Sequence, residues 1–158
     1  ALDWRETDIY LLKSNGIWRW VPEKNGLLFC DLADLRSETF FAAPHLQVAP
    51  VHIVYVSNRP RTETLISRLG EGVVEKLRHS AWTPEKLEEM RTRSMIIDVG
   101  AKIQAVYMAA AAMDLSCVAR TGFDARHVER ILRLQKGESV VAIQTLGYRP
   151  NSILDAIK

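Results

Sequence analysis

One stretch near the middle of the chain, residues 96–115, is apolar on nearly every side of a helix. A helix on the surface of a soluble protein has a single apolar stripe and a polar opposite face. This stretch therefore predicts a buried helix, enclosed in a core or in a subunit interface. Asp98 and Lys102 interrupt the run. No segment is accordingly expected to span a membrane, because a spanning helix needs about 20 predominantly apolar residues.

The helix leads into a predicted short strand over residues 115–119, and then into a turn formed by Arg120, Thr121 and Gly122. Small residues in a turn let a flat group come close to the backbone, and binding residues are frequent on such turns. The turn is therefore a candidate ligand contact, in which a backbone N–H and a cation could meet the same molecule.

Composition limits the class of protein. The chain has 158 residues, of which 47% are hydrophobic and 25% charged, with a net charge of +2. This length can bury a core, and we expect a single domain over residues 1–158. The arginines alternate with glutamates along apparent helices, which is typical of solvated faces with local ion pairs. We expect no nucleic-acid partner.

The cysteines and histidines bear on location and metal binding. Cys30 and Cys117 lie in apolar, strand-like runs, and lone buried thiols are typical of a reducing compartment, here the cytoplasm. The chain opens at Ala1 without a basic and then apolar leader, and we expect a processed chain or a fragment of a longer protein. No metal site is expected, because the histidines share no ligand spacing with one another or with the cysteines: His45, His52, His79 and His127.

The first third of the chain predicts hairpins. Residues 9–13 and 17–21 flank Ser14-Asn15-Gly16, and Asn-Gly between apolar runs is a strong hairpin signal. Trp18 and Trp20 alternate with their neighbours and are expected on one face of the strand, as packing residues. A third strand is predicted over 27–30, and Asp31 or Asp34 is expected to cap a short helix that continues to Phe41.

The remaining elements alternate between strand and helix. Residues 51–56 form a nearly continuous apolar run, typical of a central strand. Residues 59–80 predict a polar helical excursion broken at Gly70 and Gly72. Thr83 before Pro84 predicts a helix start, with the helix continuing to Met113 and Gly100 as a point where it could bend. Asp124 should cap a helix over 125–134, followed by a strand over 140–146. The order predicts an α+β fold, one sheet covered by helices.

Several segments taken together resemble the nitroreductase family of flavoproteins, in particular its branch related to the SagB-type thiazole/oxazole-forming dehydrogenases. The resemblance covers almost the whole chain and is carried by Asp8-Ile9-Tyr10-Leu11, Asn15-Gly16-Ile17-Trp18-Arg19-Trp20, residues 31–36, Ala49-Pro50 with residues 51–56, Asp98-Val99-Gly100 with Gln104, and Leu146-Gly147-Tyr148-Arg149-Pro150. It implies an FMN-dependent oxidoreductase with a mainly antiparallel sheet. It also implies an intertwined homodimer with the central helix at its interface and a flavin at each of two interface sites.

The resemblance also implies which residues bind the cofactor. Asp3 stands where the family has Asn, and Arg5 where Gln is common, at the end of a loop that contacts the flavin ring. Gln104 matches a position facing the cofactor. Arg120, Thr121 and Gly122 match the loop beside the reactive ring edge. The sequence departs from the family in lacking the amino-terminal Arg-rich segment that holds the FMN phosphate and, unless Lys158 begins it, the basic pair after the Gly-Tyr-Pro motif.

Each of these residues could instead have an ordinary structural role. Arg120 could instead pair with Asp124 on the surface, and Gln104 could hydrogen-bond to a neighbouring backbone group. Asp98 could be catalytic, although a structural partner for an arginine is the expected role. No catalytic residue is assigned.

Two functions remain open. The first is an oxidoreductase in which NAD(P)H reduces FMN and the flavin reduces a nitroaromatic, a quinone or a similar small acceptor by ping-pong kinetics, or else oxidises a substrate derived from an amino acid. A flavin needs a donor at one ring nitrogen and positive charge at the opposite edge. The second is a non-catalytic or complementing subunit that does not bind FMN by itself. Motifs for nucleotide-binding loops and for a serine nucleophile are absent from the sequence.

Overall fold

The computed structural model describes residues 6–39, 49–68 and 83–149, and within them the protein is built on one six-stranded sheet. The strand order is β3-β2-β1-β4-β6-β5, and all neighbouring strands are antiparallel. The strands are β1 (Thr7–Lys13), β2 (Gly16–Val21), β3 (Gly26–Asp31), β4 (Val51–Asn58), β5 (Leu115–Arg120) and β6 (Glu138–Tyr148). The helices are η1 (Pro22–Lys24), η2 (Ser37–Thr39), α2 (Arg59–Arg68), α4 (Pro84–Ala112) and α5 (Ala125–Ile131). The predicted α+β class is confirmed.

The first hairpin forms where the sequence predicts it. Strands β1 and β2 pair from Tyr10 with Arg19 to Lys13 with Gly16. Gly16 has a φ of +123°, and a Cβ at this position would lie 2.3 Å from the carbonyl oxygen of Asp31. Glycine is required here for both reasons, because other residues rarely adopt this φ and have no room for a side chain.

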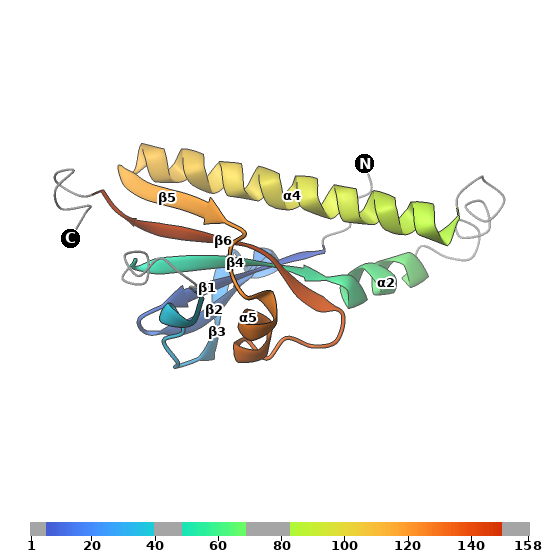
Figure 1. Cartoon of the computed structure of the whole chain (residues 1–158), viewed down its shortest axis with the longest axis horizontal. Coiled ribbons are helices and arrows are strands. Elements are labelled where there is room, and N and C mark those ends of the chain that lie inside the picture. The colour runs from blue at the N-terminus through green and yellow to red at the C-terminus, as the bar shows by residue number, and fades with distance from the viewer. Residues whose placement is uncertain (1–5, 40–48, 69–82, 150–158) are drawn as a thin grey trace.

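Helix α4 lies along one face of the sheet, and α5 lies on the opposite face (Figure 1). The predicted start of α4 is confirmed, since the Thr83 side chain caps the helix by accepting a hydrogen bond from the Lys86 backbone N–H. Each helix covers its own hydrophobic cluster. The cluster under α4 contains Ile53, Tyr55, Val99 and Ala142, and the cluster on the α5 side contains Leu12, Ile17, Val54, Val56, Val128, Val140 and Ile143. Strand β4 contributes to both clusters and is the centre of the core.

Of the two surroundings expected for the central helix, a core or a subunit interface, the single chain does not provide the first. Among the residues of α4, only Val99 and Ala110 are buried. One stripe of the helix packs on the sheet, whereas Ile97 and Met108 on the opposite side are 72% and 66% exposed. A sheet covers only one side of a helix lying on it, so the other apolar side of α4 is left uncovered.

Two further expectations change in the structure, and a third is not tested by it. Instead of capping a helix that reaches Phe41, the Asp31 and Asp34 carboxylates accept from the backbone of Ala33 and Arg36 two residues on, and the short 3-10 turn η2 follows; Phe41 lies outside the described residues. The thiol of Cys30 is exposed because β3 is an edge strand. Gly70 and Gly72 also lie outside the described residues.

Helix α4 bears on the expectation that no segment spans a membrane. By length and composition it is long and apolar enough to cross a membrane, with a mean hydropathy of 1.3 over its most apolar window, and it is the one such helix found within the described residues. The core helix of a soluble protein can meet the same criterion. In this structure α4 packs on the sheet through Met95, Val99, Ile103 and Val106.

Candidate functional site at the end of β5

Arg120 is the last residue of β5, and its side chain joins three parts of the fold. The guanidinium donates to the Thr39 carbonyl oxygen at 2.6 Å and to the Thr39 hydroxyl at 2.8 Å. It also donates to the Thr145 hydroxyl on β6 at 3.3 Å. The buried His52 ring lies 3.0 Å from the same Thr39 hydroxyl. Arg120 therefore ties η2 to the end of the sheet, although Thr39 is 81 residues away in sequence.

The environment of Arg120 affects its ionisation. Burial lowers the pKa of the guanidinium to about 10, because partial removal from water disfavours the charged form. The group remains cationic at neutral pH. Asp124, the alternative partner considered from the sequence, instead caps α5 by accepting from the His127 backbone N–H at 3.0 Å. The structure thus places a half-buried positive charge at the base of the turn and not in a surface pair with Asp124.

The turn beyond Arg120 is open. Thr121 and Gly122 are exposed, and a Cβ built on Gly122 would meet nothing within 4 Å. The turn is closed by a hydrogen bond from the Phe123 N–H to the Thr121 carbonyl oxygen at 3.1 Å. A flat ligand can therefore reach the backbone at Gly122 without displacing any described side chain.

Tyr107 links α4 to this end of β5. Its hydroxyl accepts a hydrogen bond from the Ala119 backbone N–H at 2.6 Å, one residue before Arg120. Gln104 lies one helical turn before Tyr107, so the two side chains lie on neighbouring parts of the helix surface. The Gln104 side chain is exposed. The structure consequently brings Gln104 to the same end of the sheet as the turn, on the outer side of α4.

A buried polar chain lies beneath α4. The Tyr55 hydroxyl donates to the Gln144 side-chain oxygen at 2.6 Å. The Gln144 amide donates to the Ile103 carbonyl oxygen at 3.2 Å and to the Cys117 sulfur at 3.0 Å. Burial raises the pKa of both the Tyr55 hydroxyl and the Cys117 thiol, because each loses water around its charged form. These groups stay neutral and fix the distance between α4, β4, β5 and β6.

Two predicted contacts cannot be placed, since Asp3 and Arg5 lie outside the described residues. Asp98 is placed, and its partners differ from the expected arginine. The Thr7 hydroxyl donates to the Asp98 carboxylate at 2.7 Å, and Lys102 on the next helical turn forms an ion pair with it. Asp98 therefore joins α4 to the start of β1. Nothing in this arrangement distinguishes it as a catalytic acid.

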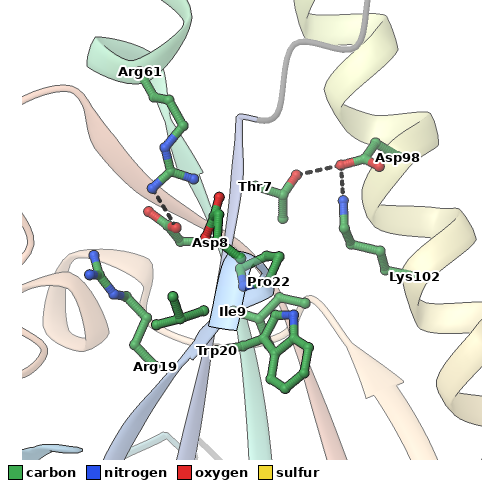
Figure 2. A pocket seen from close by; sticks show the side chains of 11 residues that line it. Thr7, Asp8, Ile9, Arg19, Trp20, Pro22, Arg61, Asp98 and Lys102 are labelled. Carbon is green, nitrogen blue, oxygen red and sulfur yellow. Dashed lines mark hydrogen bonds and ion pairs between the residues drawn. The ribbon is translucent and has the colours of Figure 1, made fainter. Parts of the chain in front are cut away.

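A separate cavity of about 340 Å³ opens where β1, β2 and α4 meet (Figure 2). Eleven residues line it: Thr7, Asp8, Ile9, Arg19, Trp20, Val21, Pro22, Glu23, Arg61, Asp98 and Lys102. Of the residues predicted to bind the cofactor, the four that the structure describes, Gln104, Arg120, Thr121 and Gly122, are not among them.

Comparison with known proteins identifies the family. The fold is that of the nitroreductases, and the chain belongs to the Nitroreductase family, which it matches over residues 18–148. The family resemblance of the sequence is thereby confirmed. No curated protein matches the chain.

The fold is shared with solved structures of low sequence identity. One is the crystal structure of a Ralstonia eutropha JMP134 protein identified as a nitroreductase. It is 24% identical, with a TM-score of 0.68 over 92% of this chain and 59% of that one. A second, from Anabaena variabilis ATCC 29413, is 18% identical, with a TM-score of 0.68 over 94% of this chain and 28% of that one. A chain of the Escherichia coli microcin synthetase McbBCD complex, solved with truncated pro-MccB17 bound, is 10% identical, with a TM-score of 0.64 over 94% of this chain and 53% of that one. This chain thus spans less than two thirds of the length of each.

Several residues that organise the site were missed by sequence reasoning. Tyr107, Thr39 and Gln144 are individually ordinary residues whose partners lie far away in sequence. A polar side chain within an apolar run, as Gln144 is in residues 140–146, is the one signal that could have singled out a member of this set.

Proposed function

We propose that this chain carries the core of an FMN-dependent oxidoreductase of the nitroreductase type. The observation that carries the proposal is the open turn at Gly122 in a chain that belongs to the Nitroreductase family. Bound FMN would supply the hydride chemistry, taking two electrons from NAD(P)H and passing them to a nitroaromatic, a quinone or a similar small acceptor in ping-pong fashion. Membership of this family favours a cytoplasmic enzyme.

The described residues fit a flavin ring at the turn. The backbone N–H groups of Thr121 and Gly122 would serve as hydrogen-bond donors to the ring edge, because the space beside Gly122 is open. The Arg120 guanidinium would supply a positive charge beneath the ring, since it is held in place by Thr39 and Thr145. A fixed positive charge stabilises negative charge that develops during reduction, at little cost in reorganisation. Gln104 would approach from the outer side of α4, and Asp3 and Arg5 from the preceding loop.

We further propose that the protein is a homodimer joined through the outer face of α4. This face carries Ile97, Ala101, Gln104 and Met108 at helical spacing, all exposed in the single chain. An apolar stripe of this kind is typical of a subunit interface. Because Gln104 belongs to the stripe, the dimer interface and the cofactor site would use neighbouring residues of the same helix face.

A test of the proposal is to replace Gly122 with valine. The substitution fills only open space, so we expect unchanged thermal unfolding but at least about a tenfold weaker affinity for FMN, because branched side chains block approach to the backbone. The matched control is Gly26→Val, which lies in edge strand β3 with only ordinary contacts. FMN binding is measured by visible absorption, with acid release and mass identification of the chromophore. Wild-type affinity in Gly122→Val would overturn the assignment of the turn.

A second function is a complementing subunit of a flavoprotein complex. The likeness to a chain of the microcin synthetase complex supports it, as does the proposed membership of the branch related to thiazole/oxazole-forming dehydrogenases. A chain that stays colourless and does not take up added FMN would favour this function over the enzyme.

A further inference from the structure

The cavity in Figure 2 occupies a place where the sheet is incomplete. Strand β1 pairs with β4 from Lys13 to Thr7, but within the described residues its pairing with β2 stops at Tyr10. Residues 7–9 therefore have a strand on one side and the cavity on the other. Its volume of about 340 Å³ falls in the range of small-molecule sites.

The backbone of β1 takes part in lining this cavity. The Asn58 N–H donates to the Glu6 carbonyl oxygen at 2.7 Å, so the peptide groups of Glu6 face β4. Successive residues of an antiparallel strand direct these groups to opposite sides. The peptide groups of Thr7 are consequently directed toward the cavity, where they can hydrogen-bond to a ligand.

The two buried or half-buried carboxylates of the cavity are already committed. The Asp8 side chain is 6% exposed, pairs with Arg61 at 2.7 Å and accepts from the Asn58 side-chain amide at 2.8 Å. Asp98 is held by Thr7 and Lys102. Glu23 lies exposed in η1 at the rim. A cation entering the cavity would thus have to displace an existing partner of Asp8 or Asp98.

Arg19 is in the opposite situation. Its half-buried guanidinium lines the cavity, and it forms no hydrogen bond or ion pair with any residue in the described part of the chain. A guanidinium is always charged at neutral pH and has five N–H donors. Apart from the exposed Glu23, the charge in this cavity that is available to a ligand is therefore positive.

The middle of the cavity is apolar. Ile9, Trp20 and Pro22 line it, and Figure 2 shows Trp20 on the side of Lys102 and Arg19 on the side of the Arg61–Asp8 pair. An indole ring offers a flat surface on which another planar group can stack. The cavity thus combines a flat apolar wall with a cation and with backbone donors and acceptors.

From these features we propose that the cavity is a binding site for a small organic anion with a flat apolar body, of the aromatic carboxylate class. Arg19 and Trp20 are consecutive residues of β2 and project from opposite faces of the sheet. The ligand therefore occupies the gap between β1 and β2, with its carboxylate paired with Arg19 on one side and its ring against Trp20 on the other. The site is distinct from the turn at Gly122, since the two share no residue. It does not depend on the proposed flavin chemistry.

The test compares benzoate with benzamide, its neutral analogue of the same shape, by isothermal titration calorimetry on the whole chain. We expect benzoate to bind at least about tenfold more tightly, because a charge-assisted hydrogen bond is about twice as strong as a neutral one. Arg19→Gln should remove this difference, and Arg19→Lys should restore part of it. The control is Arg93→Gln, which makes the same charge change on the exposed side of α4, where Arg93 pairs with Glu89.

Three results would overturn the proposal: equal affinities for benzoate and benzamide, an unchanged benzoate affinity in Arg19→Gln, or competitive displacement of benzoate by FMN. The last would make the cavity part of a flavin site. Benzoate binding that persists in a chain unable to bind FMN, or in Gly122→Val, would support the proposal while the oxidoreductase function failed.

Discussion

Strand β4 and helix α4 are both rich in apolar residues, yet they lie in very different surroundings. In β4, all residues from His52 to Ser57 are buried, because the strand has β1 and β6 at its sides and hydrophobic clusters on both faces. In α4, a stripe including Val99 is covered by the sheet, while Ile97 and Met108 are exposed. Two elements of similar apolar composition thus form a buried strand, β4, and a helix with an exposed apolar face, α4.

The largest expected difference between β4 and α4 is in the response to the same substitution in each element. Ile53→Ala in β4 removes a side chain that is 8% exposed and packs beneath α4. We expect a loss of about 2–5 kcal/mol in the free energy of unfolding, from lost burial and the cavity left behind. In the monomer, Ile97→Ala in α4 should change it by less than about 0.5 kcal/mol. Chemical denaturation measures both, and equal losses would contradict the comparison.

Glu6, the residue immediately before β1, connects β4 to α4. Its buried carboxylate accepts from the Ser57 hydroxyl at 2.5 Å and from the Thr62 hydroxyl at 2.9 Å, and it forms an ion pair with Arg91 of α4. Glu6→Gln keeps the shape but removes the charge, and should destabilise the fold by about 2–3 kcal/mol. Glu89→Gln, on the exposed side of α4, is the control for denaturation measurements. A loss no larger than that of the control would show that this connection contributes little.

The exposed stripe of α4 can be tested by adding a charge. Met108→Lys should raise the dissociation constant of the proposed dimer by at least about tenfold, because a cation loses its hydration when an apolar interface closes over it. Sedimentation equilibrium gives this constant. Leu32→Lys makes the same change at a residue that is 79% exposed and lies after β3. If Leu32→Lys weakens association and Met108→Lys does not, the interface is not on α4.

The smallest expected effect is a difference in the rates at which the two thiols are modified. Burial raises the pKa of Cys117, so its thiolate is scarce at pH 8 and increases only at more alkaline pH than for an ordinary cysteine. Cys30 is exposed on edge strand β3. We expect iodoacetamide to modify Cys30 before Cys117, with the rate at Cys117 rising steeply with pH, as followed by peptide mass spectrometry. Equal rates at pH 8 would mean that β5 is as accessible as the sheet edge.

Much of the fold could be predicted because its signals are local. Asn15-Gly16 specifies a hairpin turn, Thr83 and Pro84 specify a helix start, and Asp124 caps the next helix, all within a few residues of the element concerned. The continuous apolar run of β4 indicated a central strand for the same reason. Burial of α4 could not be predicted, because it depends on how many sides of the helix the rest of the molecule covers.

The candidate site was only partly accessible to sequence reasoning. The order of elements, the turns and caps, and the small residues at 121 and 122 follow from the sequence, because short-range sterics and hydrogen bonding decide these. The tertiary structure alone decided that Arg120 is held by Thr39 across 81 positions, that Tyr107 reaches the end of β5, and that β1 and β2 separate to leave a cavity beside Arg19. Such contacts join residues distant in the chain, and only the packing of the sheet and its helices brings them together.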